Sequence, residues 1–452
     1  MINMILPLIL LITFCLFGVA TGILTGLLPG LHVNNIALIL LSISPAIIAL
    51  LQPLESAGIT STFTLILIAV FIISVSISHT FHDTIPTTFL GAPDEDTALS
   101  VLPAHGLLLE GNGYEAVYLS AMGSLGAIFT SLLLLYPIRF LIGNPIGGYE
   151  TLQNIMFYVL LCITILMIGT EKARIPEHSP KKLLPTFTGM GFALFIFILS
   201  GIFGIIILEM TVESPIGLNS PVLFPALSGL FGLPTLLTSL ATQPSIPKQI
   251  IKEPQLNKKT KKDSILSIIT GSFAGLLVSI IPGITSATGT ILAMNARGES
   301  NSRQTIVTLS AVNTACAFFV VAVLFIILRS RSGATLAVMD LIAIKEWSTT
   351  LIPNNLIYLL IALLLGGTAS FFSTAAVGKI FAKFFHKIPY QKVVLSTIIL
   401  IIILVFLFTG MLGVLILFVA TFIGLLTVQW GVRRSHAMGV LLLPIMLYFF
   451  QM

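Results

Sequence analysis

Four side chains that could bind or exchange a cation lie close together in the first part of the chain: His79, Thr80, His82 and Asp83. They follow directly on an apolar run, and ionisable residues at membrane depth are functional candidates because burying them in lipid is costly. His79, His82 and Asp83 fall within about one helical turn, where side chains three and four positions apart share a face. The cluster therefore predicts a site for proton or cation coupling, or for gating. A polar turn at the membrane interface is the structural alternative, and the spacing matches no known metal motif, so we expect no metal.

A Pro-Gly pair, Pro29-Gly30, is followed by Asn34 and Asn35. Proline cannot continue a preceding helix and glycine permits an unusual turn, so this stretch predicts a break between two helical segments. Either asparagine could cap the second segment, and the free N–H groups at such a helix N-terminus attract an anion. We expect these four residues to contribute to a substrate site. An ordinary short loop between two spans is the alternative.

A second Pro-Gly pair, Pro282-Gly283, precedes a stretch that is dense in hydroxyl groups. Thr285, Ser286 and Thr288 could replace the hydration shell of an oxyanion or of Na⁺. Close packing of small residues between helices would explain the same composition. We place all five residues in the expected substrate site.

Asn313 and Thr314 lie inside a later apolar run, and we take them as counterparts of His79-Thr80 in the second half of the chain. An Asn buried in a membrane is usually a hydrogen-bonding contact between helices and is otherwise a ligand for a substrate or an ion. These two residues complete the expected substrate site.

The elements that must position these residues are membrane helices. Of the 452 residues, 56% are apolar and only 9% are charged, whereas a soluble domain carries about 25% charge. Only helices or closed barrels satisfy the backbone in lipid, and the apolar runs have helical length, so we expect an all-α polytopic membrane protein with roughly 10–14 membrane segments. We expect several of them to be broken, most clearly around Pro29, Pro86, Pro93 and Pro282.

The chain carries no nucleotide-binding Gly-x4-Gly-Lys-Ser/Thr loop, and no serine is placed with a histidine and a carboxylate as a nucleophile. We therefore expect no enzyme activity. Cys15, Cys162 and Cys316 all lie in apolar stretches without metal or disulfide spacing, and we expect them to be buried. The net charge of +5 is dispersed among short loops, which excludes nucleic acid as an expected partner and makes the charge a topology signal.

Positive charge predicts the orientation. Six lysines in residues 248–262 predict that residues 243–263 form a cytoplasmic linker between a first membrane repeat, 1–242, and a second, 264–452. This orientation puts three arginines on the outer side, although positive residues normally favour the cytoplasmic side: Arg139, Arg329 and Arg331. The last two could attract an anion or belong to a solvated loop.

The two halves resemble each other locally. Residues 22–40 and 275–292 each contain an apolar span, a Pro-Gly pair, a polar cluster and another apolar run, and the two Pro-Gly pairs are 253 positions apart. Opposite orientation combined with internal similarity is typical of a transporter built from two inverted repeats, with re-entrant or broken hairpins at the Pro-Gly pairs.

Three stretches, 18–40, 79–129 and 271–294, resemble the TctA family, the large membrane subunit of tripartite tricarboxylate transporters, and in particular its stand-alone archaeal relatives. The resemblance spans nearly the whole chain. It implies an inverted-repeat secondary transporter that takes up carboxylates such as citrate with an ion gradient, together with a small membrane subunit and an extracytoplasmic solute-binding protein. Residues 313–338 lack the Pro-Gly signature that the family carries there, so dependence on a binding protein is left open. Residues 281–293 are also similar to a hairpin of polyprenyl-phosphate transporters.

We therefore expect an ion-coupled secondary transporter of an organic anion that works by alternating access in the cell (plasma) membrane. A polyprenyl- or lipid-phosphate transporter (flippase) of the same architecture is the first alternative. An integral-membrane enzyme that acts on lipid-linked substrates through His79, His82 and Asp83 is the second. Expected partners are membrane lipid and a small anionic substrate or a lipid phosphate, with a homodimer as a candidate assembly. No cofactor is expected beyond Na⁺ or H⁺ as the coupling ion.

Overall fold

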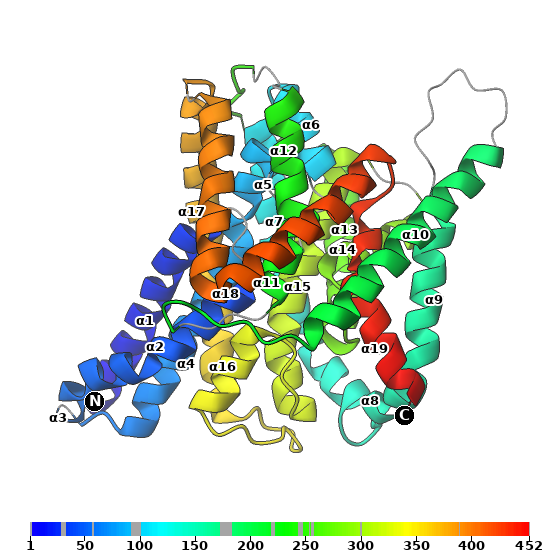
Figure 1. The fold of residues 1–452 in the computed structure, drawn as a ribbon. Coiled ribbons are helices and arrows are strands. Elements are labelled where there is room, and N and C mark those ends of the chain that lie inside the picture. The colour runs from blue at the N-terminus through cyan, green and yellow to red at the C-terminus, as the bar shows by residue number, and fades with distance from the viewer. Residues whose placement is uncertain are drawn as a thin grey trace.

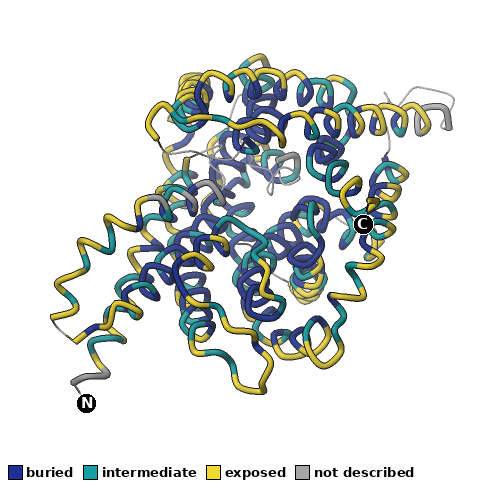
Figure 2. Tube along the Cα trace, turned by 60° about the horizontal axis from the view of Figure 1, so that its bottom comes forward, coloured by how far each residue is buried: buried dark blue, intermediate teal, exposed yellow. Residues whose placement is uncertain are grey.

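The computed structural model describes residues 2–28, 33–56, 58–91, 101–171, 183–217, 222–242, 247–252, 254, 257–298, 301–387 and 389–451. Every regular element in this part of the chain is a helix, as expected (Figure 1). Buried residues fill the middle of the helix assembly, and exposed residues lie mainly on its periphery (Figure 2). The exposed side chains include many Leu, Ile and Phe, which suits a surface that faces lipid.

The first half of the chain contains α1 (Ile2–Gly26), α2 (Val33–Leu51), α3 (Pro53–Ser56), α4 (Ser61–His82), α5 (Thr84–Leu90), α6 (Val101–Leu109), α7 (Gly113–Ile142), α8 (Gly148–Asn154), α9 (Met156–Gly169), α10 (Leu183–Leu208), α11 (Leu223–Leu227), the π-helix η1 (Ser228–Gly232) and α12 (Leu233–Thr242). The second half contains α13 (Lys258–Ile280), α14 (Ser286–Arg297), α15 (Ser302–Ile327), α16 (Gly333–Leu341), α17 (Asn354–Phe384), η2 (Phe385–Lys387), α18 (Tyr390–Gln429), η3 (Arg434–Met438) and α19 (Gly439–Gln451).

Nine of the described helices are long and apolar enough to cross a membrane, and the pair α8–α9, bent by 71°, raises the number to ten. This count reaches only the lower edge of the expected range, because some apolar runs form short helices. α14 is the clearest case, since its 12 residues rise about 18 Å, well short of the ~30 Å hydrocarbon core.

The expected break at Pro282 is confirmed, whereas around Pro86 the helix is only slightly interrupted, since residues 61–90 form one candidate membrane span. α13 ends at Ile280 and α14 begins at Ser286, so Pro282 lies in the turn between them. Asp83 separates α4 from α5, and Pro86 lies in the first turn of α5, where proline is tolerated. Pro29 and Pro93 lie outside the described residues.

Two helix pairs repeat the same contacts. A Cβ added to Gly18 of α1 would meet the Ser74 Cβ and the Phe71 carbonyl oxygen of α4 at 2.6 and 2.7 Å. A Cβ added to Gly271 of α13 would meet Ala311 Cβ and the Thr308 carbonyl oxygen of α15 at 2.7 and 2.8 Å. Gly18 and Gly271 are 253 positions apart, the spacing of the Pro-Gly pairs, and their α4 and α15 partners are 237 positions apart.

This register changes one expected correspondence. When residues of α4 are matched to those 237 positions later in α15, the residue equivalent to Asn313 is Ser76 and not His79. Each helix pair also packs on a helix from the other half of the chain. α17 of the second half packs on α4 of the first, and α7 of the first half packs on α15 of the second. The inverted arrangement of the halves stays a prediction, and the repeated helix pair is the observation that favours it.

The expected linker docks on the first half. The backbone N–H of Ile250 donates to the Gly111 carbonyl at 2.7 Å, and the side chain of Gln249 bonds to both Gly113 N and the Leu108 carbonyl. The last residues of the linker, from Lys258, already form the start of α13. The described part of the linker is therefore held against the turn between α6 and α7, at the top of Figure 1.

Candidate functional site

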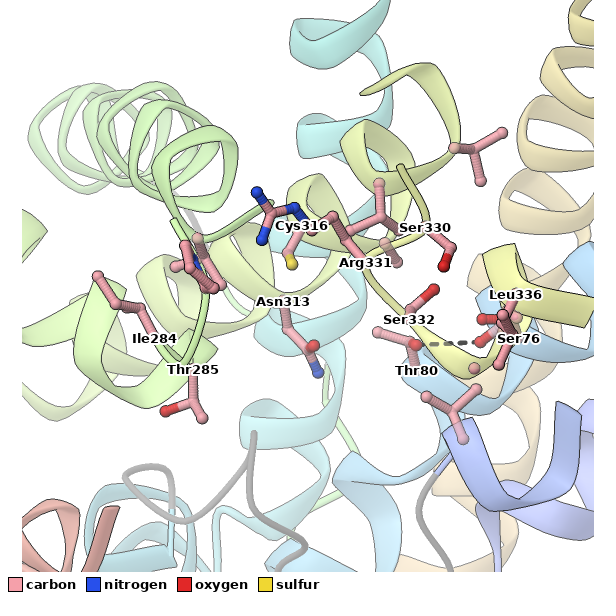
Figure 3. A pocket seen from close by; sticks show the side chains of 18 of the residues that line it. Ser76, Thr80, Ile284, Thr285, Asn313, Cys316, Ser330, Arg331, Ser332 and Leu336 are labelled. Carbon is pink, nitrogen blue, oxygen red and sulfur yellow. Dashed lines mark hydrogen bonds between the residues drawn. The ribbon is translucent and has the colours of Figure 1, made fainter. Parts of the chain in front are cut away.

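A cavity of about 530 Å³ lies between elements of both halves (Figure 3). α4 supplies Ser76 and Thr80, and the turn before α14 supplies Pro282, Gly283 and Thr285. α15 supplies Asn313 and Cys316, and the loop after α15 supplies Ser330, Arg331 and Ser332. No acidic side chain is among the described residues that line the cavity, so Arg331 makes its lining positive.

The turn at Pro282-Gly283 aims the start of α14 at this cavity. Gly283 takes a φ of 76°, which is strained for other residues, and a Cβ there would approach Ile445 of α19 at 2.6 Å. Thr285 then caps α14, because its hydroxyl accepts the N–H of Thr288 at 3.5 Å. The N-terminus of α14 therefore faces the cavity, with the partial positive charge of a helix start.

The loop that carries Arg331 is fixed by its own hydrogen bonds. Leu328 ends α15 with a φ of 54°, a left-handed conformation that is uncommon for a leucine. Its counterpart 237 positions earlier is Gly91, which ends α5 with a φ of 64°. After the turn, the Thr335 hydroxyl accepts the backbone N–H groups of Arg331 and Ser332 at 3.1 and 3.0 Å.

Ser332 begins α16 with a capping box, so a second helix N-terminus lies beside the cavity, which Gly333 and Ala334 also line. The Arg331 side chain extends from this fixed loop past Cys316 (Figure 3). Its Nη2 donates to the Tyr149 hydroxyl of α8 at 2.5 Å, while its Nε is buried without a hydrogen-bond partner. The Arg331 side chain and two helix N-termini therefore border one cavity.

Asn313 is the member of the expected second-half cluster that reaches the cavity. It is only 9% exposed, and its Oδ1 accepts the Ser286 hydroxyl at 3.3 Å. Thr288 and Thr314 are fully buried away from the cavity, with hydroxyl groups that have no partner. The structure thus brings together Pro282, Gly283, Thr285 and Asn313, with Ser286 behind Asn313, but not Thr288 or Thr314.

The expected coupling cluster divides between two faces of α4. Thr80 lines the cavity, and its hydroxyl donates to the Ser76 carbonyl at 3.0 Å (Figure 3). His79 and His82 do not line it. His79 Nδ1 lies 3.2 Å from the Thr25 hydroxyl of α1, and His82 contacts Ser373 of α17 through Nε2 at 3.0 Å. The two histidines therefore join helices behind the cavity wall.

Asp83 forms the break between α4 and α5, where its carbonyl accepts the Thr87 hydroxyl at 2.8 Å, and it does not line the cavity either. Pro29 and Gly30 lie outside the described residues, as do the side chains of Asn34 and Asn35, although Val33 at the start of α2 does line the cavity.

Ser76 and Arg331 are the main cavity residues that the expected site lacked. The sequence did point to Arg331, because this residue lies on the predicted outer side although positive charge normally favours the cytoplasmic side. Arg139, another exception, is structural: its buried guanidinium donates to the carbonyls of Trp347 and Ser348. The cysteines correct a further expectation, because Cys15 is buried but Cys162 is exposed and Cys316 borders the cavity. Apolar surroundings do not predict burial when helices face lipid.

Comparison with known proteins places this architecture in a family. The model of the tripartite tricarboxylate transporter TctA family matches residues 12–439. The chain belongs to the TctA family. It is also 28% identical to an uncharacterized protein of Methanocaldococcus jannaschii over 441 residues, which is 96% of this chain and 98% of that protein. No solved structure matches the chain. A TctA-family membrane protein is thus a transporter-type protein, and the cavity is its candidate substrate site.

Proposed function

We propose that this TctA-family protein is an ion-coupled secondary transporter that binds an organic anion of the carboxylate type in the cavity around Arg331. The observation that carries the proposal is the convergence of the Arg331 guanidinium with the N-termini of α14 and α16 on a cavity without a described acidic side chain. A carboxylate fits this arrangement because a guanidinium and helix N–H groups both donate hydrogen bonds to negatively charged oxygens.

The neutral polar groups suit the rest of such a substrate. Ser76, Thr80, Thr285 and Asn313 approach the cavity from opposite walls. Hydroxyl and amide groups can bind a second carboxylate, a hydroxyl of the substrate, or a partly dehydrated Na⁺. The apolar residues between them, such as Ile73, Val278 and Val320, would pack against its carbon skeleton.

Alternating access is the proposed mechanism. The α1–α4 and α13–α15 pairs repeat the same close contacts, and both pairs contribute residues to the cavity wall. In transporters with inverted repeats, rocking of one repeat against the other opens a site between them to each side in turn. His79, Thr80, His82 and Asp83 are the proposed coupling and gating residues, with H⁺ or Na⁺ as the coupling ion.

The proposed location is the plasma membrane, with residues 243–263 in the cytoplasm. The lysines of this segment favour that side. Membrane lipid and the anionic substrate are the proposed partners, and a homodimer and a solute-binding protein are candidates that cross-linking in native membranes would detect.

Uptake into proteoliposomes tests the proposal. The purified protein is reconstituted and supplied with radiolabelled mono-, di- and tricarboxylates under imposed H⁺ or Na⁺ gradients. We expect gradient-dependent uptake of at least one carboxylate, and we expect Arg331→Gln to reduce it by at least tenfold. Arg303→Gln is the matched control, since Arg303 is exposed, pairs with Glu115 and does not line the cavity.

Two results would reject the carboxylate proposal. One is the absence of uptake for the whole panel under either gradient. The other is transfer of a fluorescent polyprenyl phosphate between leaflets without any carboxylate uptake, which would establish the flippase alternative.

A further inference from the structure

A second hollow of about 300 Å³ lies next to the cavity on the α8 side of the protein, at the bottom of Figure 1. Asn144, Tyr149, Arg329 and Glu346 are among the residues that line this outer hollow. It lies at the opposite end of the molecule from the docked linker, so the proposed orientation places it on the external side.

One residue pair connects the linings of the two spaces. Tyr149 lines the outer hollow, Arg331 lines the cavity, and the two side chains are joined by the 2.5 Å hydrogen bond from Arg331 Nη2 to the Tyr149 hydroxyl. The Arg331 guanidinium carbon also lies 5.5 Å from the centre of the Tyr149 ring, close enough for a cation–π contact. Tyr149 is 6% exposed, so this contact is buried although it borders a surface hollow.

We propose that the Tyr149–Arg331 pair is the external gate of the cavity, and that an incoming anion opens it by taking the place of the Tyr149 hydroxyl on Arg331. The inference rests on the proposed function for the identity of the ligand, but the gate itself is a statement about access to the cavity. A neutral phenol is a weaker acceptor than a carboxylate, so an anion can displace it from the guanidinium.

The surrounding contacts explain how the gate can close again without a ligand. Arg331 is attached to a loop whose backbone is held by Thr335, so only its side chain needs to move. Arg329 also lies near the Tyr149 ring, at 5.8 Å, and it shares the lining of the outer hollow with Glu150 and Glu346, so that lining carries both signs of charge.

Cys316 provides a direct probe, because it borders the cavity next to Arg331 (Figure 3). In a Cys15→Ala/Cys162→Ala background, Cys316 is the only thiol of the chain. A membrane-impermeant methanethiosulfonate reagent added outside intact cells then reports access to the cavity from that side. No substrate is needed, so a failure of the gate is distinguishable from a failure of the transport proposal.

We expect slow labelling of Cys316 in the background protein and about tenfold faster labelling after Tyr149→Phe, which removes the hydroxyl and keeps the ring. Tyr136→Phe is the matched control, since its hydroxyl donates to the Thr350 carbonyl at 3.1 Å and does not contact Arg331. Equal rates in the background and in Tyr149→Phe would overturn the gate, and so would fast labelling of the background protein.

Discussion

Ser76 of α4 and Asn313 of α15 occupy equivalent positions in two helix pairs with the same contacts, and both line one cavity. Equivalent residues from the two halves therefore meet at a single site, which is the geometry expected when a substrate is bound between repeats. The pair is asymmetric in chemistry: Ser76 offers a hydroxyl, whereas Asn313 offers an amide that can both donate and accept.

We predict that Ser76→Ala and Asn313→Ala each weaken substrate binding by about tenfold, because each removes a hydrogen-bonding group from the cavity. The measurement is the concentration dependence of carboxylate uptake into proteoliposomes, together with thermal unfolding in detergent. Ser279→Ala is the control, since Ser279 is buried in α13 and bonds to its own helix at the Leu276 carbonyl. Unchanged affinity in both cavity variants would place the substrate elsewhere.

The glycines that bring the paired helices together lead to the second prediction. A Cβ on Gly22 would lie 2.7 Å from the Val75 carbonyl oxygen and 2.5 Å from Ser78 Cβ, and a Cβ on Gly275 would lie 2.7 Å from Ala315 Cβ. We expect Gly22→Ala and Gly275→Ala to lower the unfolding temperature by similar, large amounts, since the backbones must separate.

Gly191→Ala is the control for these two variants, because nothing lies within 4 Å of a Cβ at Gly191 in α10. There, the substitution should be neutral or stabilise the helix by about 0.5–1 kcal/mol. If Gly22→Ala and Gly275→Ala unfold at the native temperature, the close packing of the repeated pairs is not needed for stability.

The sequence could predict the local backbone features of this site, but not the contacts between residues that are distant in the chain. The Pro-Gly break at Pro282 and the caps after it could be predicted, because proline and hydroxyl residues determine local backbone geometry. The charge pattern marked Arg331 as a candidate anion contact, but its contact with Tyr149 could not be predicted, because Tyr149 lies 182 positions away and the turn at Leu328 shows no glycine in the sequence. The histidines of α4 were chemically attractive, but only the packing against α1 and α17 shows that they face away from the cavity.

The histidine geometry leads to the third prediction. His82 Nδ1–H donates to the Ser78 carbonyl at 2.7 Å, so the neutral ring accepts the Ser373 hydroxyl at Nε2. With both nitrogens engaged by the protein, we expect His82→Ala to lower thermal stability, because it leaves a cavity in the core and removes the contact with α17.

Thr80→Val provides the comparison, because it keeps the side-chain shape and removes the hydroxyl at the cavity. We expect Thr80→Val to lower uptake while the unfolding temperature stays within a few degrees of the native value. Retained gradient-driven uptake in a folded His82→Ala protein would remove His82 from the proposed coupling residues.

A buried ion cluster at the end of α9 leads to the last prediction. The carboxylate of Glu171 is 3% exposed and accepts hydrogen bonds from Arg433 Nε at 2.8 Å and from His436 Nε2 at 2.5 Å. Burial alone would raise the pKa of Glu171, but the bonds from His436 and Arg433 outweigh it, so the pKa lies below its ordinary value of 4.5. The ionised form is therefore favoured by folding.

The sign of the pH effect follows from this shift. The carboxylate contributes its full stabilisation above the unfolded pKa, about 4.5, and loses it as the pH falls through the lower folded value. We expect Glu171→Gln to cost about 3 kcal/mol at pH 7, because Arg433 and His436 lose their charged acceptor. Below pH 4.5, the difference between the native protein and Glu171→Gln should shrink. Thermal unfolding between pH 3 and 7 measures both effects, with Glu209→Gln as the control at an exposed glutamate. A difference that stays constant over this range would show that the charge of Glu171 does not stabilise the fold.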